Sequence, residues 1–177
     1  MAGTLSVQKI QGLATAADPT TVEISSGHTL YAPGHIIQVV QKYVNTPQSV
    51  STASYTSVVS QAITPKSASS KIRVQISCSM VGNSTAGNAT FFQLYRGSTI
   101  IGFAYGTSYS TSGGFIPTNN YNVGTLAIDY LDSPATTSAT TYDLRMGAFN
   151  GTAYLGRRGD TAHTSAPTFF TLTEVAA

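Results

Sequence analysis

The feature that most constrains the fold of this chain is an alternation of apolar and polar residues over positions 71–80. Successive side chains of a β-strand point to opposite faces of a sheet, whereas a helix repeats every 3.6 residues. The alternation therefore predicts a strand with one buried face. Its predicted core residues are Ile72, Val74, Ile76, Cys78 and Met80. The side chains expected to face solvent or a second subunit are Lys71, Arg73, Gln75, Ser77 and Ser79.

Other segments rich in β-branched and aromatic residues lie between turn-forming residues, and each is predicted to be a strand. They cover residues 36–43, 54–63, 90–96, 98–105, 125–131, 140–149, 154–155 and 167–175. The side chains expected to share the core with the first strand are Leu126, Ile128, Tyr130, Leu144 and Met146. About eight strands with alternating faces and frequent turns predict an all-β, antiparallel sandwich.

Composition agrees with this fold class. Charged residues make up 9% of the 177 positions, against about 25% in an average soluble domain. A bundle of amphipathic helices would need more Glu, Lys and Arg on its wet faces, so the low charge argues against one. It also weakens the repulsion that keeps proteins monomeric, and we therefore expect self-association.

The first 34 residues differ from the rest of the chain. Their apolar residues Leu5, Val7, Ile10 and Leu13 are too few to build a core, and Ala32-Pro33-Gly34 marks a boundary. We expect residues 1–34 to form an extended N-terminal arm and residues 35–177 to form the sandwich head. Because an ordered arm must recover its lost backbone entropy, we expect these four residues to anchor the chain on another protein.

Several kinds of function have little support in the sequence. The net charge of +2 lacks the clustered Lys and Arg of a nucleic-acid binder, and no stretch is apolar enough to span a membrane. Cys78 is the single cysteine, and His28, His35 and His163 have no recognised metal spacing. No Gly-x-Ser-x-Gly motif is present. We expect no cofactor, no metal and no enzymatic activity.

Two groups of residues leave alternatives open. Asp129 and Asp132 flank the end of a predicted strand, where a carboxylate pair could bind Ca²⁺ or act in glycoside hydrolysis, or where Asp132 could simply begin a turn. Arg157 and Arg158 could pair with an acidic partner surface or a glycan carboxylate, or they could belong to a solvated turn.

Residues 106–122 are rich in Gly, Ser, Thr and Asn and are predicted to form a long surface loop. Tyrosine among small polar residues is typical of adaptable binding loops, although packing against a second subunit explains the same composition. The candidate binding residues of this surface are Tyr105, Tyr109, Tyr121, Arg157 and Arg158.

Six segments of the chain resemble small virion proteins of tailed bacteriophages, especially those of marine and cyanobacterial hosts. They are residues 3–12 (GTLSVQKIQG), 22–30 (VEISSGHTL), 33–40 (PGHIIQVV), 63–74 (ITPKSASSKIRV), 92–102 (FQLYRGSTIIG) and 170–175 (FTLTEV). The resemblance implies a jelly-roll head like that of the tumour necrosis factor and complement globular domains, assembled as a homotrimer. Candidate aromatic residues near the trimer axis are Phe91, Tyr95 and Phe169.

The resemblance leads to two functional hypotheses. The first is a structural protein on the exterior of the virion that decorates or cements the capsid, with its arm on the major capsid protein. The second is a tail-fibre or receptor-binding protein, whose arm contacts a tail protein and whose head binds a host surface glycan. The absence of a fibre-like repeat in the sequence favours the first hypothesis.

Overall fold

The structure is a computed structural model that describes residues 32–103, 111–160 and 164–177. Within these ranges the chain forms eleven strands and no helix. The strands are β1 (Ile36–Val44), β2 (Gln48–Val50), β3 (Thr56–Ile63), β4 (Lys71–Asn83), β5 (Thr90–Arg96), β6 (Thr99–Ile101), β7 (Gly113–Phe115), β8 (Gly124–Asp132), β9 (Thr140–Ala148), β10 (Ala153–Leu155) and β11 (Thr168–Val175).

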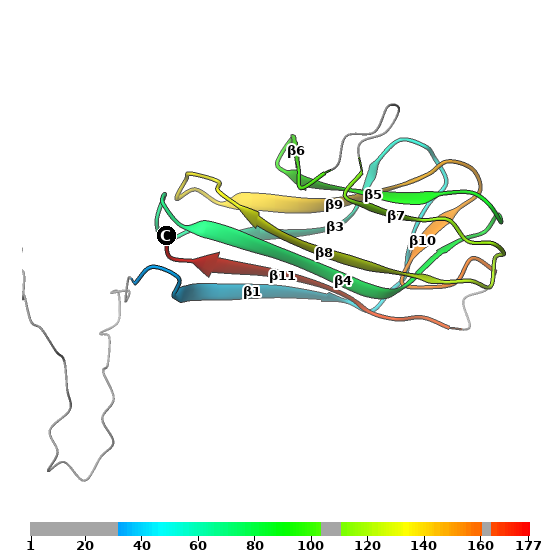
Figure 1. The fold of residues 1–177 in the computed structure, drawn as a ribbon, viewed down its shortest axis with the longest axis horizontal. Helices are drawn as coiled ribbons and strands as arrows, with labels where there is room; N and C mark the ends of the chain where they lie inside the picture. Colours follow the sequence, from blue (N-terminus) through cyan, green and yellow to red (C-terminus); the bar gives the residue numbers. More distant parts are fainter. Residues whose placement is uncertain (1–31, 104–110, 161–163) are drawn as a thin grey trace, which may run out of the picture. The chain divides into compact units, whose positions relative to one another are not determined.

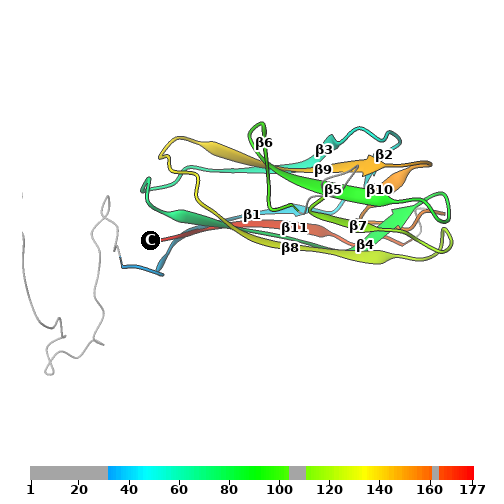
Figure 2. The same ribbon diagram turned by 45° about the horizontal axis from the view of Figure 1, so that its top comes forward.

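The strands form two sheets that pack face to face (Figures 1 and 2). Sheet A has the order β1-β11-β4-β10-β2, with β8 on the other side of β4, and sheet B has the order β3-β9-β5-β6, with β7 also on β5. Every pairing is antiparallel, and the chain crosses between the sheets from β3 to β4, from β4 to β5 and from β8 to β9. Such crossings define an antiparallel jelly-roll sandwich, so the predicted fold class is confirmed.

The alternation in β4 produces the core as expected. Ile72, Val74, Ile76 and Cys78 are buried, and Lys71 and Arg73 are exposed. Leu126 and Ile128 from β8 and Leu144 and Met146 from β9 close the same core, with Tyr130 partly buried against it. Cys78 is a small core residue, and its thiol lies 3.3 Å from the carbonyl oxygen of Met80.

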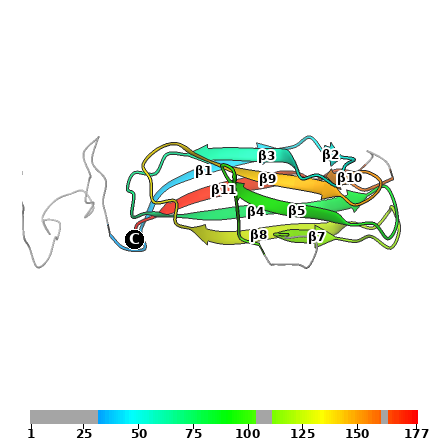
Figure 3. The same cartoon turned by 90° about the horizontal axis from the view of Figure 1, so that it is seen from above.

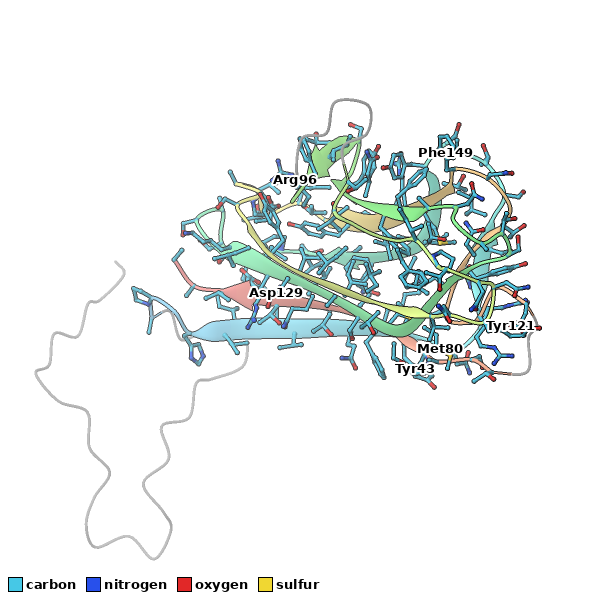
Figure 4. The ribbon with its side chains drawn as sticks, turned by 45° about the vertical axis from the view of Figure 1, so that its right-hand side comes forward. Tyr43, Met80, Arg96, Tyr121, Asp129 and Phe149 are labelled. Atoms are coloured by element: carbon cyan, nitrogen blue, oxygen red, sulfur yellow. The ribbon has the colours of Figure 1, made fainter. Side chains whose placement is uncertain are left out.

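Met80 is the exception, because it is only partly buried. The β4–β8 register shifts between Cys78 and Val81, where β4 advances three residues and β8 advances two, from Leu126 to Gly124. This β-bulge inserts one residue and reverses which side chains point inward. Val81 takes the core position, and Met80 lies beside Tyr43 on the outer side of sheet A (Figure 4). The prediction that Met80 is buried is therefore wrong.

Two short strands lie where no strand was expected. β7 occurs inside the 106–122 segment and pairs with β5, and β2 pairs with β10. The segment is therefore not one continuous loop, although its residues 106–110 lie outside the described ranges. The strand predicted over 98–105 is shorter, since β6 ends at Ile101.

The end of the head near residue 32 is held by main-chain bonds and by a buried carboxylate. The Gly34 amide donates to the Ala176 carbonyl and the Ala176 amide donates to the His35 carbonyl, both at 2.8 Å. Glu174 is fully buried and accepts hydrogen bonds from the Gln38 side chain and from the Lys66 and Ser67 amides. This carboxylate fixes the loop between β3 and β4 against the last strand. Residues 1–31, which include most of the predicted arm, lie outside the described residues.

Candidate assembly and binding surfaces

The outer face of sheet A exposes large apolar side chains. Tyr43 of β1 is 58% exposed and Phe169 of β11 is 39% exposed, and their ring centroids lie 5.5 Å apart. The strand register places these two residues in one row with Ser77 of β4 and Ala127 of β8. A hollow of about 210 Å³ beside Phe169 has Ser77 and Ala127 in its lining. This row has no charged side chain.

The next rows of the same face carry charges that are already paired. Arg73 of β4 donates to Asp129 of β8, with its Nε 2.8 Å from Oδ1. The guanidinium of Arg73 holds the pKa of Asp129 below its ordinary value, mainly through this hydrogen bonding. Leu131 and Val39 flank the pair and are each about half exposed. The face therefore has apolar groups at both ends and a self-neutralised pair between them (Figure 3 shows the strands from above).

The outer face of sheet B is covered by its own polar network. Arg145 bonds Asp143 at 2.8 Å, and its guanidinium lies 3.8 Å from the centroid of the Tyr95 ring. Phe91 is 6% exposed, and Tyr55 packs edge-on against it at 5.0 Å. Of the three aromatic residues proposed for the trimer axis, Phe169 lies on the outer face of sheet A, whereas Phe91 and Tyr95 lie beneath neighbouring side chains on sheet B.

Asp129 and Asp132 do not form a pair. They are three positions apart in one strand, so their side chains point to opposite faces. Asp132 is buried and accepts hydrogen bonds from Arg96 at 2.8 and 2.9 Å and from the Tyr142 hydroxyl at 2.7 Å. Burial, strengthened by the bond to Asp132, raises the pKa of Tyr142 well above its usual range. The two carboxylates therefore stabilise the sandwich separately, and the geometry gives no basis for a shared calcium or catalytic site.

The candidate binding residues that the structure describes gather at one end of the head, which we call the loop end. It contains the connections that follow β4, β7, β9 and β10, and Tyr121 lies there (Figure 4). Arg158 bonds Asp160 at 3.0 and 2.7 Å and lies 5.6 Å from the centroid of the Tyr121 ring. Arg157 lies over the Tyr154 ring at 4.1 Å. Tyr105 and Tyr109 lie outside the described residues.

An apolar cavity of about 490 Å³ opens at the same end, between β5, β7 and the turn after β9. Phe91 and Phe115 line it, and Ile116 and Phe149, both about 60% exposed, stand at its walls. No charged residue lines it. A cavity of this size and composition suits a neutral group such as an apolar side chain or the apolar face of a sugar. The sequence gave no signal for it, because β5, β7 and β9 are distant in the chain.

No protein-family model matches the chain, and no curated protein matches it at the threshold used. Among the residues that the structure describes, no helix is long and apolar enough to cross a membrane. Within the same ranges, no three His, Cys, Asp or Glu side chains gather in a way that could hold a metal ion.

Proposed function

We propose that this chain is a non-enzymatic structural protein on the exterior of a bacteriophage virion, and that it works as a homotrimeric capsid decoration or cement protein. The jelly-roll head and the resemblance of six sequence segments to small phage virion proteins support this proposal. The arm residues Leu5, Val7, Ile10 and Leu13 would contact the major capsid protein, while the head would contact two further copies of itself.

The observation that carries the proposal is the outer face of sheet A. Tyr43 and Phe169 form an exposed aromatic pair there, and the charges of Arg73 and Asp129 neutralise each other. A face with this composition can be buried against another copy without leaving an unpaired charge in the interface. Sheet B offers less, because its outer face carries the Asp143–Arg145 network.

A second function, host adhesion by a tail-fibre or receptor-binding protein, is favoured by the loop end. The apolar cavity with Phe149 at its wall and the neighbouring Tyr121 and Arg158 would there contact a host surface glycan, and the arm would bind a tail protein. Both functions place the loop end away from the segment that joins the arm at Ala32.

The oligomeric state is tested by light scattering on the purified full-length chain at micromolar concentration. We expect three times the 18.5 kDa mass of one chain. Phe169→Asp places a charge in the proposed interface and should give monomers. Thr141→Asp adds the same charge to an exposed position of β9 and should leave the mass unchanged. A monomeric wild-type chain would contradict the trimer.

The location is tested by electron microscopy of the particle that carries the chain. Density for trimers on the shell supports decoration, and density at the tail tip supports adhesion. Deletion of residues 2–30 tests the anchor, because the head should keep its fold but lose its attachment to the particle. Attachment of the truncated chain at the wild-type level would move the anchor into the head.

A further inference from the structure

Arg157 differs from the other arginines in its lack of a carboxylate partner. Arg73, Arg96, Arg145 and Arg158 each form an ion pair with an aspartate. Within the described ranges no carboxylate lies at ion-pair distance from Arg157. The described acidic residues are all engaged, since the four aspartates bond these arginines and Glu174 accepts three N–H groups. The described part of the head therefore contains no carboxylate left over for Arg157.

The guanidinium of Arg157 is nevertheless held in place. One of its faces lies over the Tyr154 ring, and its Nε donates to the Arg158 carbonyl at 2.9 Å. Its backbone is seated directly on β4, because a Cβ at Gly82 would lie 2.8 Å from the Arg157 carbonyl oxygen. A planar guanidinium fixed in this way loses little further freedom when its terminal nitrogens bind a carboxylate.

The charge inventory of the chain indicates where that carboxylate lies. The described residues carry five arginines and three lysines against five acidic residues, so their net charge is +3. Residues 1–31 contain Lys9, Asp18 and Glu23, with a net charge of −1, and the other undescribed residues carry no Asp, Glu, Lys or Arg. Asp18 and Glu23 are thus the two acidic side chains of the chain that have no assigned partner, in a segment of opposite charge to the head.

We propose that Arg157 binds a carboxylate of the N-terminal segment, Asp18 or Glu23, and so fastens this segment to a head. At about 3.3 Å per extended residue, the nine residues from Glu23 to Ala32 reach about 30 Å and the fourteen from Asp18 about 46 Å. The segment can therefore dock on its own head or on that of a second copy. The inference does not rest on the virion function, because it requires only the chain itself.

Zero-length carbodiimide cross-linking of the Arg157→Lys variant tests the contact directly. The new amine should couple to Asp18 or Glu23, which peptide mass mapping identifies, and Asp18→Asn or Glu23→Gln in the same background should abolish the product. Mixing ¹⁴N- and ¹⁵N-labelled chains shows whether the link joins one chain or two. The matched control is Arg158→Lys, whose amine should couple to Asp160. Coupling in the control without any link from position 157 to residues 18 or 23 would overturn the proposal.

Cleavage by a glutamate-specific protease gives a second readout that leaves the arginine site unlabelled. Glu23 and the buried Glu174 are the only glutamates of the chain, so early cleavage reports on residue 23. Arg157→Gln should accelerate this cleavage several-fold. Lys71→Gln removes the same charge from an exposed position and should not. Equal cleavage rates in the wild type and Arg157→Gln would contradict a bound segment.

Discussion

The buried Asp132 offers a sharp test of how the two sheets are joined. It lies at the end of β8 in sheet A and accepts hydrogen bonds from Arg96 and Tyr142, which belong to β5 and β9 of sheet B. Asp132→Ala would leave the Tyr142 hydroxyl and the Arg96 guanidinium without their main acceptor. Tyr142 is fully buried, so water cannot replace the lost bond to its hydroxyl.

The magnitude follows from burial. Removing one partner of a buried ion pair costs about 3–5 kcal/mol. The Arg96 side chain is 30% exposed, and since water then compensates part of its loss, we expect about 2–3 kcal/mol for Asp132→Ala. For a chain of this size that corresponds to a fall in Tm of about 5–10 °C.

The assay is urea denaturation, in which the midpoint should fall while the slope m stays constant. Asp129→Ala is the matched control, because it removes the same group from the same strand but breaks an ion pair whose side chains are half exposed. Its midpoint should barely move. Equal destabilisation by the two substitutions would refute the claim that burial, rather than the ion pair itself, sets the cost.

Three further predictions concern the core and its supports. Tyr142 has a raised pKa when folded, so the unfolded chain loses this proton first and stability should fall above pH 10 by about 1.4 kcal/mol per pH unit; Tyr142→Phe should reduce this slope in urea titrations between pH 9 and 11.5. Glu174→Gln would set an amide donor against one of three N–H donors, and it should cost about 1–3 kcal/mol and speed amide exchange at Lys66 and Ser67; unchanged exchange would count against the loop-fixing role. Gly147→Ala would place a Cβ 2.3 Å from the Phe91 ring, and it should cost about 1–3 kcal/mol by overpacking, visible as a lower melting temperature than that of Gly87→Ala corrected for backbone strain.

Local pattern was sufficient for the fold class and for the faces of the longest strand. Alternation over residues 71–78 decides which side chains of β4 are buried, because placing Lys71 and Arg73 inside would desolvate two charges without partners. Parity likewise separates Asp129 from Asp132, although the turn and site interpretations of these residues both left it unused.

Other features exist only because distant segments meet. Met80 is turned outward by a bulge that depends on the register with β8, and the three-residue strands β2 and β7 are stable only through their pairing with β10 and β5. Phe91 and Phe169 look alike in the sequence, but Tyr55 covers the first and no described side chain buries the second to the same degree. Alternation states which residues share a face, whereas the packing of the two sheets decides what covers that face. For the same reason the chain alone identifies Arg157 as a cation, and only the folded head shows that its four fellow arginines have already taken the available aspartates.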